Sequence, residues 1–124
     1  MYNIRDANVK KFLQDTTVER RRELHKKCLE RYPNCVPIII CNSTGKNIQS
    51  TNYRFIENET DTFANFAHKV RGYITGLSEY QALFWFTENG AMISCSNTLG
   101  QIYNTHANED KMLYLFYNVE STFG

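Results

Sequence analysis

Hydrophobic residues near the start of the chain recur at helical spacing in two separate segments. Between Met1 and Gln14, apolar side chains fall where a short amphipathic helix would bury them. From Val18 to Arg31 the residues are strong helix formers, and an apolar row follows one face. Pro33 ends this segment, because the residue before a proline resists the helical conformation. The pattern therefore predicts two leading helices.

Four later segments have the apolar character of β-strands. Val36–Cys41 is continuous and β-branched, which is typical of a strand covered on both faces and therefore central in its sheet. Asn52–Ile56 follows a turn-rich stretch and predicts a returning strand, so that these two segments form a hairpin. Ala82–Phe86 predicts a third buried strand, and Met112–Tyr117 predicts a fourth.

The clearest helix pattern begins after a capping residue, which is Asp61 or Thr62. Its apolar stripe, which we expect to belong to the core, consists of Phe63, Phe66, Ala67, Val70, Ile74 and Leu77. Leu99, Ile102 and Tyr103 indicate another short helix further along the chain.

The order of these elements predicts a single α+β domain over residues 1–124. After the two leading helices come strand, strand, helix, strand, short helix and strand. In this order a long helix packs on one face of a mixed four-stranded sheet, which is the ubiquitin-like β-grasp arrangement. We expect residues 1–31 to form an N-terminal helical subdomain and residues 32–124 to form the β-grasp core.

Charge is uneven along the chain, although the net charge is only +1. Residues 1–31 carry nine Lys or Arg against five Asp or Glu, and residues 32–124 carry five against eight. The basic end favours an acidic partner or membrane headgroups. The small net charge gives no general reason to bind nucleic acid. The expected basic partner surface consists of Arg20, Arg21, Arg22 and Arg71.

Other chemistry is not indicated by the sequence. The four cysteines show no CxxC spacing, so we expect free thiols packed as small apolar groups, with no metal and no cofactor. His25, His68 and His106 have no nucleophile beside them in the sequence, which argues against an enzyme. No stretch approaches the roughly 20 apolar residues of a membrane span and no signal peptide is evident, which predicts a cytoplasmic protein.

Several stretches of the sequence are similar to one known family, and together they run from about Val18 to Gly124. They are Glu19–Arg22, Arg31–Ile40, Ala82–Phe86, Leu99–Tyr103 with His106 downstream, Glu109–Tyr114 and Tyr117–Gly124. On these stretches the chain resembles the autophagy-related ubiquitin-like modifiers, the GABARAP-like family. It resembles them as a divergent member. An acidic residue usual on the second helix is Leu24 here, and paired prolines usual after the third strand are replaced near Ile93 and Ser94.

The resemblance implies that the C-terminal Gly124, preceded by Phe123, is the reacting group. In the family, an activating enzyme adenylates this glycine and a thioester carries it to a conjugating enzyme. The usual acceptor is the amine of phosphatidylethanolamine on autophagosome membranes. A processing protease is implied if a C-terminal tail exists. Three alternatives stay open: attachment to a protein lysine within the conjugation machinery, a ubiquitin-like binding module without conjugation, and a basic-helix binder of RNA or tubulin.

The resemblance also implies a site for cargo-receptor peptides of the form aromatic-x-x-aliphatic, which add as a strand beside the second strand. The first pocket would be lined by Leu24, Cys28, Pro37, Arg54, Ile56 and Met112. The second would be lined by Phe55, Glu57, Asp61, Phe66 and Lys69. An aliphatic side chain in the second pocket would desolvate carboxylates without replacing their hydrogen bonds. We therefore expect a weak aliphatic preference there and tolerance of a basic residue at the fourth position of the peptide. Arg54, with Arg71 adding to the same field, is expected to attract acidic residues that flank the peptide.

Overall fold

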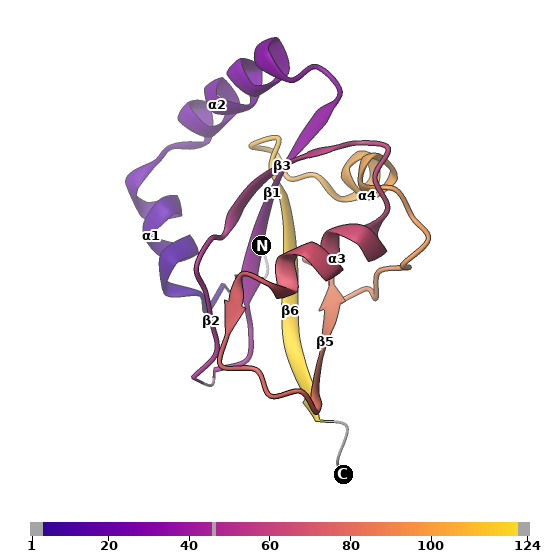
Figure 1. Ribbon diagram of the computed structural model, residues 1–124. Coiled ribbons are helices and arrows are strands. Elements are labelled where there is room, and N and C mark those ends of the chain that lie inside the picture. The colour runs from indigo at the N-terminus through magenta and orange to yellow at the C-terminus, as the bar shows by residue number, and fades with distance from the viewer. Residues whose placement is uncertain (1–3, 46, 122–124) are drawn as a thin grey trace.

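The computed structural model describes residues 4–45 and 47–121 (Figure 1). Its elements, in chain order, are α1 (Ala7–Asp15), α2 (Val18–Arg31), β1 (Cys35–Asn42), β2 (Gln49–Ser50), β3 (Arg54–Asn58), α3 (Phe63–Arg71), β4 (Ile74–Thr75), β5 (Gln81–Phe86), α4 (Leu99–His106) and β6 (Leu113–Ser121). Figure 1 shows the long strands in the middle of the molecule, with α1 and α2 to one side of them and α3 and α4 to the other.

Four strands form one mixed sheet in the order β3-β1-β6-β5. The two central strands, β1 and β6, run parallel, and each also pairs antiparallel with an outer strand. β1 is central because it is apolar on both faces, and its residues from Val36 to Cys41 are all buried. The predicted α+β fold and the hairpin of β1 with β3 are confirmed. A small separate sheet of β2 and β4 was not predicted by the sequence pattern.

Successive side chains of the central strands point to opposite faces of the sheet, and each face has its own hydrophobic core. Ile38 of β1 and Leu113 of β6 belong to the core shared with α3 and α4. Ile39 of β1 and Phe116 of β6 belong to the core shared with Phe12 of α1. The sheet is therefore the middle of three layers, and the leading helices cover the face opposite to the one that α3 covers.

Helix α3 is shorter than its apolar stripe predicts. Thr62 caps its first turn as expected, because the Thr62 hydroxyl accepts a hydrogen bond from the backbone N–H of Asn65 at 3.2 Å. The helix ends at Arg71 because Gly72, a poor helix former, closes the last turn. Ile74 lies in β4 and is still buried. The stripe correctly identified core residues but overextended the helix.

Strand β5 is half-buried, although the sequence pattern predicted a buried strand. Trp85 is the residue of this strand that is fully buried, and the others are intermediate. The reason is that β5 pairs with β6 on one side of the sheet and has no strand on its other side within the described residues.

Side-chain hydrogen bonds fix both ends of α1. Asp6 caps the first turn by accepting hydrogen bonds from two backbone N–H groups, which explains why the helix begins at Ala7 and not near residue 1. The other carboxylate oxygen of Asp6 accepts a hydrogen bond from the N–H of Asn42, at the end of β1. Just beyond the other end of α1, the guanidinium of Arg21 donates to the carbonyl of Thr16 at 2.8 Å.

Arg21 is buried and does not lie on the predicted basic surface. Its Nε donates to Asp110 Oδ2 at 2.8 Å, and the two side chains are only 8% and 2% exposed. Asp110 also accepts hydrogen bonds from the hydroxyl of Tyr114 and the backbone N–H of Met112. This ion pair joins α2 to the turn before β6. The expectation for Arg21 is wrong because its charge is neutralised inside the protein.

Candidate functional site

β3 is an edge strand, and its outer side has no partner strand within the described residues. The hydrogen bond from the Ile40 N–H to the Tyr53 carbonyl, 2.9 Å long, fixes the alternation of bonded and non-bonded pairs along the antiparallel ladder with β1. Arg54 and Ile56 therefore occupy positions that exchange no hydrogen bond with β1. Their backbone N–H and C=O groups point toward the open side of the sheet.

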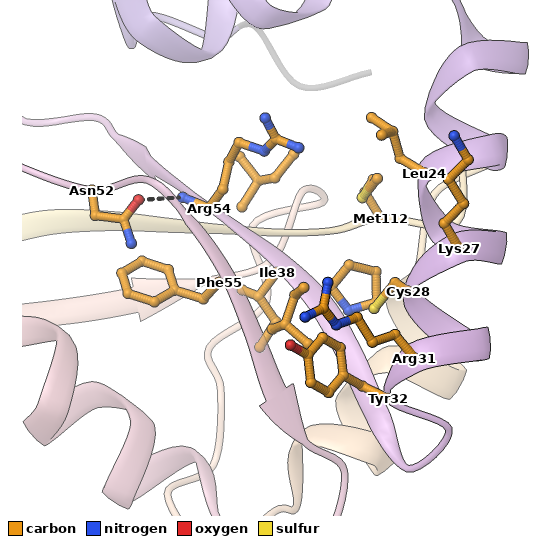
Figure 2. A pocket seen from close by; sticks show the side chains of 13 residues that line it. Leu24, Lys27, Cys28, Arg31, Tyr32, Ile38, Asn52, Arg54, Phe55 and Met112 are labelled. Atoms are coloured by element: carbon orange, nitrogen blue, oxygen red, sulfur yellow. Dashed lines mark hydrogen bonds between the residues drawn. The ribbon is translucent and has the colours of Figure 1, made fainter.

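Polar groups close both ends of this open edge. The N–H of Arg54 donates to the side-chain oxygen of Asn52 at 3.4 Å, which Figure 2 marks with a dashed line. At the other end, the carbonyl of Asn58 accepts the N–H of Asp61 at 3.1 Å. Between these two, the N–H and C=O of Ile56 face outward. A short segment of unpaired backbone is therefore exposed at the centre of β3.

A cavity of about 620 Å³ lies beside this edge, between β3 and the C-terminal half of α2 (Figure 2). The predicted first-pocket residues all line it, namely Leu24, Cys28, Pro37, Arg54, Ile56 and Met112. Lys27, Arg31 and Tyr32 also line the cavity, and sequence reasoning missed them as pocket residues. Lys27 and Arg31 each follow a predicted pocket residue of α2 by three positions, a spacing that places neighbours on one helix face and could have identified them.

The interior of the cavity is apolar. Pro37 and Met112 contribute buried side chains to its lining. Burial, and secondarily the nearby Cys35, raise the pKa of the Cys28 thiol, which therefore stays neutral and behaves as a small apolar group. Ile56 is 47% exposed beside the open backbone. Exposed apolar surface next to unpaired strand groups is the arrangement that an added peptide strand uses.

Three cationic side chains line the same cavity, and they are Lys27, Arg31 and Arg54. None of them forms an ion pair with a carboxylate in the part of the chain that the structure describes. The guanidinium of Arg31 lies 5.7 Å from the ring centre of Tyr32, and that of Arg54 lies 4.6 Å from the ring centre of Phe12. Figure 2 shows Arg54 and Arg31 at opposite ends of the cavity. Their field attracts an anionic group on a ligand.

The predicted second pocket is occupied by its own side chains. Phe55 and Phe66 pack edge to face with their ring centres 5.7 Å apart, and Phe66 is fully buried. The Lys69 ammonium donates to both carboxylate oxygens of Glu57, at 2.7 and 2.8 Å. Asp61 accepts hydrogen bonds in the first turn of α3. The expectation that an entering side chain would leave Glu57 unpaired is wrong, because Glu57 already has an internal partner.

The predicted arginine surface is not a single surface. Arg20 is exposed and pairs with Glu23, its neighbour on α2, at 3.2 Å. Arg22 Nε donates to the Glu109 carbonyl at 2.7 Å. Arg71 lies on α3, on the opposite face of the sheet, and donates to a carbonyl of β5. With Arg21 buried, the two predicted arginines that remain exposed on α2, Arg20 and Arg22, are separated from Arg71 by the thickness of the sheet.

The predicted reacting residue Gly124 and its neighbour Phe123 lie outside the described residues. Within residues 4–45 and 47–121, no helix is long and apolar enough to cross a membrane. The same ranges contain no cluster of three or more metal-ligating side chains. The cysteines are free, but Cys95 is exposed, so the expectation of packed thiols does not hold for it.

Comparisons with known proteins agree on one family. A family model described as "Autophagy protein Atg8 ubiquitin like" matches residues 19–124. An autophagy-related protein 8-like protein of Dictyostelium discoideum is 29% identical over 118 residues, which is 93% of this chain and 94% of the relative. Autophagy-related protein 8 of the same organism is 25% identical over 95% of this chain and 97% of its own length. The crystal structure of Trypanosoma brucei ATG8 matches with a TM-score of 0.78 at 30% identity, covering 92% of this chain and 97% of that one.

Proposed function

Because the chain belongs to the Atg8 family of ubiquitin-like autophagy proteins, which are modifiers and not enzymes, we propose that it is a lipid-conjugated adaptor. In this proposal Gly124 is joined to phosphatidylethanolamine on autophagosome membranes, and the β3 edge recruits cargo receptors through short aromatic-x-x-aliphatic peptides. The protein is cytoplasmic before conjugation and membrane-associated afterwards. Its partners are the activating and conjugating enzymes, a processing protease if a tail exists, and motif-bearing receptors.

The observation that carries the peptide-binding part is the open backbone of Ile56 beside an apolar cavity. A peptide that adds as a strand gains backbone hydrogen bonds from the Ile56 N–H and C=O. Its alternate side chains point to one face, so an aromatic residue paired near Ile56 enters the cavity and is desolvated there. Lys27, Arg31 and Arg54 then favour peptides with acidic residues around that aromatic anchor.

The fourth peptide position meets a different chemistry from the one expected from the sequence. Glu57 is 9% exposed and Lys69 is 48% exposed, so an arriving side chain contacts the ammonium before the carboxylate. A basic residue gains little from a carboxylate that is already neutralised, and it faces the exposed charge of Lys69. We therefore propose that the aromatic anchor carries most of the affinity, and that Lys or Arg at the fourth position weakens binding relative to Leu.

Replacing Ile56 with Asp tests the peptide-binding part. The change puts a charge where the aromatic anchor must be desolvated, and we expect a loss of about 2 kcal/mol or more, roughly 30-fold in Kd. Isothermal titration calorimetry with an acidic-aromatic-x-x-aliphatic peptide measures it. Leu29→Asp is the matched control, because Leu29 is an apolar residue of similar exposure, 41% against 47%, that does not line the cavity. Equal loss in both variants would place the binding site elsewhere.

A separate measurement tests conjugation. We expect the intact mass of the protein recovered from cells to include a phosphatidylethanolamine adduct that phospholipase treatment alters. Gly124→Ala should abolish this adduct, because the terminal residue must pass through a narrow cleft in the activating and conjugating enzymes, and only glycine has no side chain to obstruct it. An adduct on another protein would support the alternative of a protein-conjugated modifier. The unmodified mass alone, from cells with active autophagy, would favour a binding module without conjugation.

A further inference from the structure

Helix α1 lies outside residues 19–124, which the family model matches, so that match does not explain what α1 does. The helix is nevertheless firmly held. At the start of α1, the Asp6 carboxylate accepts a hydrogen bond from the N–H of Asn42, at the end of β1. Just beyond the other end of α1, the guanidinium of Arg21 donates a hydrogen bond to the carbonyl of Thr16. The side chains of Val9 and Phe12 are buried against the sheet. α1 is therefore a fixed element next to the cavity, and not a loose extension.

One contact between α1 and the cavity is the cation–π pair of Phe12 and Arg54. Phe12 is 7% exposed, and the Arg54 guanidinium lies over its ring at 4.6 Å from the ring centre. Tyr53 packs edge-on against the same ring, with the ring centres 6.3 Å apart. Arg54 itself is exposed and lines the cavity. The ring is thus fixed by its neighbours, while the cation that it holds remains accessible to a ligand.

We propose that α1 is a working part of the peptide-binding site, in which Phe12 is a positioning residue for Arg54. By holding the guanidinium at the end of the cavity nearest the start of β3, Phe12 makes the site select peptides that carry a carboxylate beside the aromatic anchor. This inference rests on the proposed peptide binding. It adds a determinant of selectivity that lies on α1 and does not itself line the cavity.

The physical reason is preorganisation. A free arginine side chain on a strand edge samples many rotamers, and ordering it against a ligand costs entropy that cancels much of the gain from an exposed ion pair. A cation held over an aromatic ring has already lost part of that freedom, so more of the attraction appears as affinity. The ring neutralises no charge, so Arg54 keeps its full attraction for a carboxylate.

Arg31 and Tyr32 provide an internal comparison at the other end of the cavity. Their separation is larger, 5.7 Å, and Tyr32 is 43% exposed and adjacent in sequence to the arginine that it contacts. The Tyr32 ring is therefore less enclosed by neighbouring side chains than the buried ring of Phe12. The two ends should differ in how strongly the aromatic residue controls charge selection.

The experiment uses the full chain and two synthetic peptides that share an aromatic-x-x-aliphatic core and carry either Glu or Gln directly before the aromatic residue. We expect the wild-type protein to prefer the Glu peptide by about fivefold, near the upper end for an exposed ion pair. Phe12→Leu should lower this preference to below about twofold, mainly by weakening the affinity for the Glu peptide and with little change in the affinity for the Gln peptide. Phe12→Tyr, which keeps an aromatic ring, should restore it. Tyr32→Leu, at the other end of the cavity, should change the Glu-to-Gln ratio clearly less than Phe12→Leu does.

Two further measurements separate positioning from simple loss of structure. Adding Phe12→Leu to Arg54→Gln should have no extra effect on the ratio, since both changes remove the same interaction. In the absence of peptide, the side-chain protons of Arg54 should show a ring-current shift that Phe12→Leu removes and Phe12→Tyr retains. Because both peptides are titrated into the same sample, a partly unfolded fraction affects them equally and cannot change the ratio.

The outcomes distinguish the two hypotheses. If the wild-type protein binds neither peptide, the proposed function fails and this inference fails with it. If it binds both, but the ratio is the same in the wild-type protein and in Phe12→Leu, peptide binding stands and the role of Phe12 is overturned. A ratio that changes in Tyr32→Leu as much as in Phe12→Leu would also overturn it, because selection would then not depend on the fixed ring.

Discussion

Removing Asp110 should be among the most damaging single substitutions in the molecule. Asp110→Ala leaves the Arg21 guanidinium, whose side chain is 8% exposed, without its carboxylate. It also removes the acceptor for the Tyr114 hydroxyl and the Met112 N–H. Breaking a buried ion pair by deleting one partner typically costs about 3–5 kcal/mol. Against a total stability of roughly 5–15 kcal/mol for a domain, this is about a fifth or more of the whole.

Urea denaturation measures this loss, with Trp85 as the reporter. Trp85 is buried, packs against Phe63 with ring centres 5.8 Å apart, and is the single tryptophan of the chain. With a denaturant slope of roughly 2 kcal/mol per M, a loss of about 4 kcal/mol moves the midpoint down by about 2 M. The tyrosine hydroxyl also reports the change. Burial first, and then the hydrogen bond to Asp110, raise the pKa of Tyr114 far above its ordinary value, and Asp110→Ala should lower that pKa.

An exposed ion pair on α1 supplies the matched control. Lys11 and Asp15 lie 3.2 Å apart, but their side chains are 78% and 58% exposed, so Asp15→Ala should cost less than about 1 kcal/mol. Replacing both buried partners, as Arg21→Met with Asp110→Leu, should recover part of the loss, because no uncompensated charge remains. The Tyr114 hydroxyl and the Met112 N–H still lack their acceptor in this double variant, so the recovery should not be complete. If Asp110→Ala and Asp15→Ala shift the midpoint equally, the buried pair does not hold α2 in place and the reasoning is refuted.

Two smaller predictions concern pH and a glycine. Burial, and then the nearby Lys111, lower the pKa of His25, so the unfolded chain binds a proton there more readily than the folded one, and the free energy of unfolding should fall as the pH drops through about 6.5. Thermal unfolding across this range should show a weaker slope for His25→Asn; an unchanged slope would assign the dependence to other groups. Gly76 has φ +90°, and a Cβ there would lie 2.3 Å from the Asn47 carbonyl oxygen, whereas Gly90 has φ +84° and open space around it. Gly76→Ala should therefore destabilise the protein by about 1–3 kcal/mol, more than Gly90→Ala in the same denaturation assay, and equal losses would mean that the crowding has no effect.

Local signals explain which parts of the fold could be predicted. The sequence pattern placed α2 at the residues where it is found, because Thr17 caps its start and Pro33 prevents its continuation. The pattern overextended α3, because Ile74 continues the helical spacing beyond Gly72 although it belongs to a strand. Periodicity reports which residues are buried more reliably than which element buries them. The helix ends because of Gly72, and the spacing of apolar residues takes no account of a single glycine.

Contacts between distant residues explain the errors at the candidate site. Arg21 was assigned to the surface because it sits in a basic run, and its partner Asp110 is 89 positions away in the sequence. The pairing of Glu57 with Lys69 likewise joins two different elements. The first-pocket residues taken from the resemblance do line one cavity, while Lys27, which also lines it, was not among the predicted residues. A resemblance to a family predicts which positions line a pocket, but it does not predict ion pairs that are particular to a divergent member.

The way in which the β3 edge is kept open argues that it has a use. An unpaired strand edge invites aggregation, and proteins usually shorten it, charge it or cover it. This strand has five residues and begins with the charged Arg54. At its two ends the Arg54 N–H donates to the side-chain oxygen of Asn52, and the Asn58 carbonyl accepts from the N–H of Asp61. Only the central Ile56 then combines outward backbone groups with an exposed apolar side chain. If the edge were simply tolerated, a polar residue at position 56 would lower the aggregation hazard at no cost to the core. An isoleucine at this position, beside a cavity lined by cations without a carboxylate partner among the described residues, supports the proposed docking of a peptide strand.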